Sequence, residues 1–150
     1  MKAVIFALAL LANSISSPVR ADTDHELRAT YERFVAAQNA RDLNRVRELL
    51  IDAPHFLWVS DGMAVWGANA MLERMASFQE AEVWRVEPDL ARAVSVQVTG
   101  TTAFLHLALT LVIGSSPSPD RLRFLVSMLC VRTAEGWRIA ALFTAPEKAS

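Results

Sequence analysis

TAFLHLALTLVI, residues 102–113, is the stretch that decides the fold, because it alternates with the two-residue period of a β-strand. One face of this strand carries Ala103, Leu105, Leu107, Leu109 and Leu111. The other face is also mostly apolar, although it includes His106 and Thr110. A strand with one face in water would alternate more cleanly between apolar and polar residues. We therefore expect both faces of this sheet to be covered.

Further strands with the same period flank this stretch on both sides. The pattern predicts strands over about 83–87, 92–99, 121–133 and 136–144. Gly100-Thr101 and the sequence SSPSP at 115–119 separate neighbouring strands, and AEG at 134–136 predicts a tight hairpin. Hairpin links between successive strands favour an antiparallel sheet.

The residues before this sheet have helical spacing. Thr23 and Glu26 have the spacing of a capping box, and the helix that they predict continues to about Ala40. Asp42 is a candidate N-cap for a second helix, which must end before Pro54.

A short strand and a third helix complete the pattern. FLWV at 56–59 predicts a strand, Asp61-Gly62 predicts a turn, and Gly67 opens a helix that ends near Phe78. Helices followed by hairpin-linked strands predict an α+β fold, with the helices on one face of an antiparallel sheet. A chain of 150 residues has room for one domain of ordinary size.

Composition excludes several classes of function. Hydrophobic residues make up 53% of the chain, which is too many for a disordered protein, and a formal net charge of −1 argues against a nucleic-acid binder. The single cysteine, Cys130, excludes an intramolecular disulfide and a cysteine-based zinc site. It lies in an apolar stretch, so we expect it to be buried and inert.

The N-terminus has the layout of a secretory signal peptide. Lys2 precedes an unbroken apolar run over 3–12, and a small polar stretch then leads to Val19-Arg20-Ala21. A membrane anchor is the alternative, but spanning needs about twenty apolar residues. We expect residues 1–21 to be removed after Ala21, and residues 22–150 to form one periplasmic or secreted domain without a membrane span.

Three stretches resemble a known family. YERFVAAQNARDL at 31–43 is similar to the first helix pair of SnoaL-like and ketosteroid-isomerase-like proteins, members of the nuclear transport factor two-like superfamily. Residues 55–67 resemble that family's first strand and turn, and VRTAEGWRI at 131–139 resembles its closing hairpin. The resemblance implies a cone-shaped, cystatin-like roll, in which a curved antiparallel sheet wraps around three helices. Its apolar interior would hold a small ligand.

The resemblance also locates the positions of ketosteroid isomerase chemistry. That mechanism uses a tyrosine on the first helix, an aspartate base on the first strand and a protonated aspartate on a later strand. The matching positions here are Phe34, Trp58 and either Ser127 or Met128. Phenylalanine donates no hydrogen bond and tryptophan is not a base, so the resemblance does not carry the isomerase mechanism over.

The same resemblance suggests which side chains would line the pocket, with plain core packing as the alternative for each. The predicted ligand-binding residues are Phe34, Trp58, Met71, Met75, Trp84 and Ser127. His106 is the candidate acid/base if its strand face lines the cavity, and otherwise belongs to a sheet face or a subunit contact. The three histidines lack the close spacing of a metal site, so we expect neither a metal nor a cofactor.

Three functions fit these observations. The first is an exported, non-catalytic module that binds a small apolar or amphipathic molecule. The second is a SnoaL-like isomerase, dehydratase or cyclase that uses His106 as its acid/base. The third is a dimeric module that binds another protein. We also expect a homodimer that forms through the outer face of the sheet, because a second sheet is the simplest cover for that face.

Overall fold

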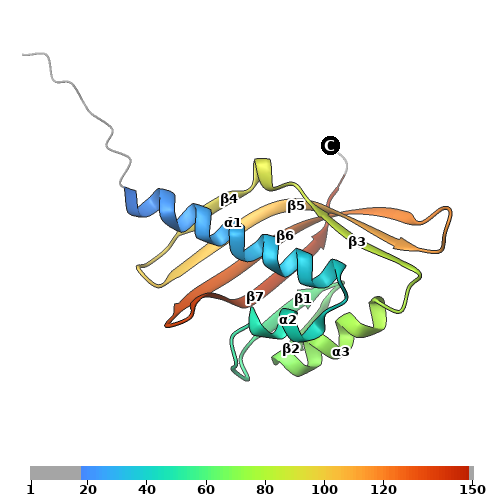
Figure 1. Ribbon diagram of the computed structural model, residues 1–150, viewed down its shortest axis with the longest axis horizontal. Coiled ribbons are helices and arrows are strands. Elements are labelled where there is room, and N and C mark those ends of the chain that lie inside the picture. The colour runs from blue at the N-terminus through green and yellow to red at the C-terminus, as the bar shows by residue number, and fades with distance from the viewer. Residues whose placement is uncertain (1–17, 149–150) are drawn as a thin grey trace, which may run out of the picture.

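The computed structural model describes residues 18–148, and three α-helices precede most of the strands in the chain. They are α1 (Pro18–Asn39), α2 (Leu43–Glu48) and α3 (Ala68–Phe78). Figure 1 shows α1 lying across one face of the sheet, with α2 and α3 grouped at the end where β1 and β2 lie. The signal-peptide prediction falls largely on residues 1–17, which are outside the described residues.

Seven strands form one sheet with the order β2-β1-β7-β6-β5-β3, and β4 pairs with the other end of β5. A short 3-10 helix, η1 (Leu90–Arg92), links β3 to β4. The strands are β1 (Leu57–Ser60), β2 (Met63–Trp66), β3 (Val83–Pro88), β4 (Val94–Gln97), β5 (Thr102–Gly114), β6 (Asp120–Thr133) and β7 (Gly136–Pro146). The predicted α+β fold with three helices on a curved sheet is confirmed, with one difference: β1 runs parallel to β7.

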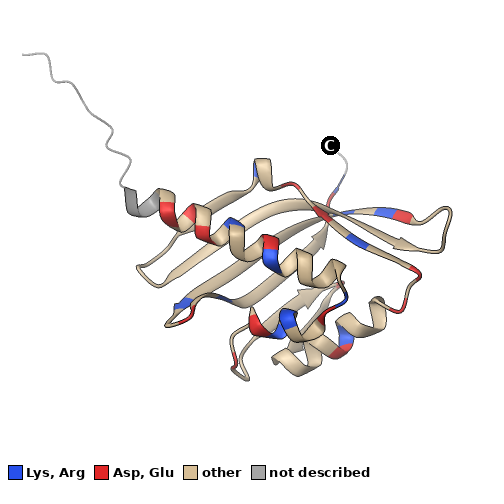
Figure 2. Cartoon of the chain, viewed as in Figure 1, with Lys and Arg blue, Asp and Glu red and all other residues tan. Residues whose placement is uncertain are grey.

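The sequence alternation of β5 and β6 becomes two distinct sheet faces. Leu105, Leu107 and Met128 turn toward α1 and are almost completely buried in the core. In the register of the pair, His106 lies opposite Ser127 on the outer face. Figure 2 shows that β5 carries no charged residue, while both signs are interspersed along the helices and near the strand ends.

A bulge in β7 changes which side chains face inward. Cys130 pairs with Ile139 but Leu129 pairs with Ala141, so Ala140 has no partner in the register. One extra residue on a strand reverses the alternation beyond it. Leu142 therefore faces the interior, and Phe143 lies outside with 44% of its surface exposed.

One local prediction is wrong and two are incomplete. Thr23 is not an N-cap, because α1 begins at Pro18 and Thr23 lies within the helix, 3% exposed. The residues after the Asp61-Gly62 turn form a second strand of a hairpin, β2, before α3 begins. The strand predicted over 92–99 is shorter, because η1 occupies its start and Asp89 caps that turn.

Three polar residues within positions 39–42 fix the C-terminal end of α1 to the neighbouring elements. Asn39 exchanges two hydrogen bonds with Val86 of β3, at 3.0 and 2.7 Å. Arg41, at a positive φ of 56°, donates to backbone carbonyls of the loop between α3 and β3. Asp42 accepts from the Arg45 backbone N–H and is the N-cap of α2, as predicted. These contacts fix α1 against β3 and close one end of the fold.

Candidate functional site

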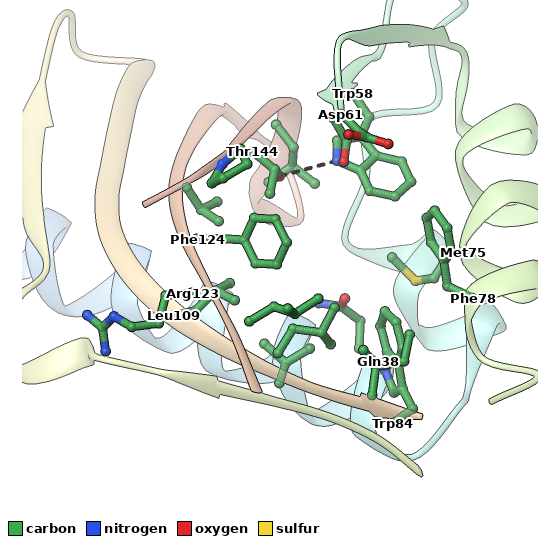
Figure 3. A pocket seen from close by; sticks show the side chains of 18 of the residues that line it. Gln38, Trp58, Asp61, Met75, Phe78, Trp84, Leu109, Arg123, Phe124 and Thr144 are labelled. Carbon is green, nitrogen blue, oxygen red and sulfur yellow. Dashed lines mark hydrogen bonds between the residues drawn. The ribbon is translucent and has the colours of Figure 1, made fainter. Parts of the chain in front are cut away.

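A cavity of about 690 Å³ lies between α1, α3 and the inner face of the sheet. Helix α1 contributes Tyr31, Phe34 and Gln38, which share one helical face because they are spaced three and four residues apart. Figure 3 shows Trp58 and Thr144 at one end of the cavity, and Gln38 and Trp84 at the other. The remaining lining residues include Met71, Met75, Phe78, Val86, Leu109, Leu111, Ile113, Leu122, Phe124, Val126 and Leu142.

Five of the six residues predicted to bind a ligand line this cavity. They are Phe34, Trp58, Met71, Met75 and Trp84. The sixth, Ser127, is placed wrongly, because β6 turns Val126 and Met128 inward and Ser127 outward. Successive side chains of a strand point to opposite faces of the sheet, so Ser127 must face outward when Val126 and Met128 face inward.

His106 lies on the same outer face as Ser127. Its Nδ1 is 2.9 Å from the Ser127 Oγ, a hydrogen bond across β5 and β6. Since Leu105 and Leu107 face the core, the imidazole points away from the cavity. The sequence predicted an acid/base role for His106 only if its strand face lined the cavity. That face does not line the cavity.

The aromatic end of the cavity is organised around Trp58. Its indole Nε1 donates to the Thr144 Oγ1 at 3.3 Å, and its ring meets the Phe78 ring edge-on, with centroids 6.4 Å apart. The guanidinium of Arg74 lies near both rings, 5.6 and 5.0 Å from their centroids, within range of a cation–π contact. Trp58 is thus held at one end of the cavity by an edge-on ring contact and a cation.

Asp61 is the carboxylate of the lining. It lies in the turn between β1 and β2 at a positive φ of 53°, followed by Gly62 at 70°, and it is exposed. Two successive positive φ values are typical of a tight hairpin turn, which Asp-Gly favours. The sequence pattern therefore found the turn but not its place beside the cavity (Figure 3).

Sequence reasoning also missed several other polar side chains of the lining, among them Gln38, Thr144 and Tyr31. The helical spacing places Gln38 on the same face as Tyr31 and Phe34, but it was not predicted as a ligand-binding residue. Thr144 was hidden because the bulge at Ala140 sets its direction. Tyr31 is 2% exposed, and burial raises the pKa of its hydroxyl well above the ordinary value, so this group is a neutral donor.

The thiol of Cys130 and the possible metal ligands among the described residues suggest no further chemistry. Cys130 is buried, and desolvation raises the pKa of its thiol to about 12, so it is a poor nucleophile. Among residues 18–148, no three His, Cys, Asp or Glu side chains come close enough together to hold a metal ion. No helix in that range is long and apolar enough to cross a membrane.

Solved structures with this architecture are many, and their sequences are distant. A ketosteroid isomerase-like protein from Erwinia carotovora atroseptica is 19% identical, with a TM-score of 0.66, over 83% of this chain and 96% of its own. An NTF2-like protein with a cystatin-like fold from Novosphingobium aromaticivorans is 17% identical, with a TM-score of 0.72, over 88% and 87%. An NTF2-like superfamily protein from Salmonella enterica serovar Typhimurium is 14% identical, with a TM-score of 0.74, over 87% and 95%.

At these identities the structural likeness shows the fold alone. No curated protein sequence matches the chain. A family model described as the SnoaL-like domain matches residues 27–142, which is most of the domain that the sequence predicts. The chain therefore belongs to the SnoaL-like domain family.

Proposed function

We propose that this protein binds a small, predominantly apolar molecule in the cavity between α1, α3 and the sheet. The observation that carries the proposal is the cavity itself. Its volume of about 690 Å³ falls within the roughly 300–1,000 Å³ of sites for small molecules. Its walls are mainly aromatic, aliphatic and methionine side chains. Such walls favour an apolar ring by burial of its surface.

The same walls argue against ketosteroid isomerisation. Phe34 and Trp58 line the cavity at the positions where the resemblance expects an oxyanion donor and a base. A positioned base contributes about 10²–10⁴-fold to rate and an oxyanion donor about 10²–10³-fold. We therefore expect no turnover of a β,γ-unsaturated ketosteroid. Measurable turnover would show that Asp61 or another group supplies the base.

Binding can be tested with the neutral fluorescent probe N-phenyl-1-naphthylamine. We expect its emission to rise on binding, and Trp58→Ala to weaken its affinity by about fivefold or more, because an aromatic wall of the cavity is lost. Trp66→Ala is the matched control. Trp66 is a tryptophan on the neighbouring strand, 59% exposed and outside the lining. Its loss should leave the affinity unchanged.

Two results would count against the proposal. If the probe does not bind the folded wild-type protein, the cavity does not take ligands of this class. If Trp58→Ala and Trp66→Ala weaken binding equally, the probe binds elsewhere. Leu109→Trp, which would fill the cavity from β5, gives an independent check and should abolish binding in a variant that still folds.

A further inference from the structure

Gln38 is the side chain of the cavity that packing does not explain. It lies on the face of α1 that carries Tyr31 and Phe34, and it is 7% exposed. Its side-chain amide makes no hydrogen bond with any of residues 18–148. Among the described residues, the fully buried side-chain polar atoms without a partner are those of Arg74 and Trp84, so the Gln38 amide remains accessible from the cavity. It is therefore available to hydrogen-bond with a molecule that occupies the cavity, which leucine at the same place could not do.

Gln79 provides the contrast within the same structure. It is buried to the same extent, 6% exposed, but its Nε2 donates to the backbone carbonyl of Gln38 at 3.1 Å. That hydrogen bond ties the end of α3 to the end of α1. Gln79 is thus a structural glutamine, and the side chain of Gln38 is left directed at the cavity, as Figure 3 shows.

A second polar group at this end also lacks a partner. The indole Nε1 of Trp84 is fully buried and makes no hydrogen bond with the described residues. Trp84 lies on β3 two residues before Val86, which the Asn39 side chain ties to α1. The two N–H donors, from Gln38 and Trp84, therefore belong to the same joint between α1 and β3.

Arg41 lies at this joint, but its guanidinium donates to the backbone carbonyls of Gln79, Ala81 and Glu82, and it does not line the cavity. The cations of the lining, Arg121 and Arg123, are more than half exposed and pair with Glu87 and Glu147. An ionised ligand group at Gln38 would lose its hydration without gaining an opposite charge. A neutral oxygen, by contrast, can accept from the amide without this penalty.

We propose that the ligand carries a neutral hydrogen-bonding oxygen, such as a ketone carbonyl, that docks on the Gln38 side chain while its rings pack against Phe34, Phe124 and Trp84. This inference rests on the proposed function and narrows its ligand to apolar ring compounds with one such oxygen. Gln38 is then the residue that determines specificity, and the aromatic lining supplies most of the affinity.

The test uses three naphthalenes that differ in one group: 2-acetylnaphthalene, 2-ethylnaphthalene and 2-naphthoate. Each is measured by its displacement of N-phenyl-1-naphthylamine from the full chain and from Gln38→Leu. We expect Gln38→Leu to lower the affinity for the ketone by about fivefold, since one net hydrogen bond is lost. The affinity for the ethyl compound should stay the same or rise. The carboxylate should bind the wild type more weakly than the ketone.

Controls separate specificity from folding. Gln38→Met repeats the test if Gln38→Leu fails to fold, and Gln79→Leu should lower stability without changing the ratio of ketone to ethyl affinities. An equal ratio in wild type and in the folded Gln38 variant would overturn the role of Gln38 but leave the proposed function intact. If none of the ligands nor the probe binds the wild type, both proposals fall.

Discussion

Glu26 joins α1 to the hairpin between β6 and β7. Its carboxylate accepts from the indole Nε1 of Trp137 at 2.8 Å and from the guanidinium of Arg132 at 2.5 Å. Arg132 in turn stacks on the Trp137 ring, 4.6 Å from its centroid. The sequence pattern assigned Glu26 to a helix cap, but its partners lie more than a hundred residues away. It is a tertiary contact.

These contacts make stability depend on Glu26 in acid. The hydrogen bond from Trp137, and then that from Arg132, hold the pKa of the Glu26 carboxyl below its usual value of 4.5. A lowered folded-state pKa gives stability that is full above pH ~4.5 and is lost as the pH falls through the folded-state value. We expect Glu26→Gln to lower the free energy of unfolding at pH 7 and to flatten its fall between pH 5 and 3.

Urea unfolding at a series of pH values measures this effect. Glu135→Gln is the control. Glu135 forms an ion pair with Arg138 at 3.3 Å, but its side chain is 80% exposed, and exposed ion pairs contribute little to stability. Parallel pH profiles for wild type and Glu26→Gln would mean that the carboxylate contributes nothing as an ion.

At the scale of elements, the joint between α1 and β3 determines the shape of the cavity. Asn39 supplies both a donor and an acceptor to the backbone of Val86, as a neighbouring strand would. The joint therefore stands in for sheet pairing where β3 has no further strand at its outer edge. Gln38 and Trp84, which the proposed subsite uses, lie within two residues of Asn39 and Val86.

Asn39→Ala should lower the free energy of unfolding by about 1–2 kcal/mol, because two hydrogen bonds of about 0.5–1.5 kcal/mol each are lost. It should also lower the affinity for the neutral probe, since Trp84 and Gln38 are no longer held at a fixed separation. Thermal and urea unfolding check the first effect. Asn44→Ala, an exposed asparagine of α2, is the control and should change neither. Equal stabilities of the two variants would contradict the role given to the joint.

For the whole molecule, the outer face of the sheet is a surface that carries exposed large apolar side chains. Leu125 and Phe143 are 36% and 44% exposed there, beside the hydrogen-bonded pair of His106 and Ser127. We propose that a second copy of the chain covers this face through a twofold axis, so that the same patch meets itself. His106 would then belong to a subunit contact rather than to catalysis.

Light scattering of the chain without its first 21 residues tests the dimer. The protomer mass is about 14 kDa, from 16.6 kDa less the signal segment, so we expect twice that value at micromolar concentration. Phe143→Lys should give the monomer, because a charge is buried without a partner. Trp66→Lys, an exposed change on the edge strand β2, should stay dimeric. A wild-type monomer would end the proposal.

Export is a property of the whole chain that its first residues predict. We propose cleavage after Ala21, which would remove the beginning of α1 but keep Leu27, a fully buried apolar residue of that helix. N-terminal sequencing of the protein from its own host should read Asp22-Thr23. Full-length protein in the cytoplasm would contradict the proposal.

The sequence by itself determined the features that depend on local spacing. The alternation of β5 and β6, the helical spacing of Tyr31 and Phe34, and the cap at Asp42 were all readable, because each involves residues close in the chain. Five of the cavity residues followed from the resemblance together with this spacing. The α+β class followed from the order of helices and strands.

Tertiary structure decided what local spacing leaves open. Both faces of β5 are apolar, so only the packing of α1 against Leu105 and Leu107 shows that His106 lies outside. The parallel pairing of β1 with β7 joins segments that are about eighty residues apart in the chain. The bulge at Ala140 lies within the hairpin of β6 and β7. No residue type in the sequence marks either feature. Gln38 became a candidate for ligand recognition for the same physical reason. Whether a polar side chain has a partner depends on every element packed around it.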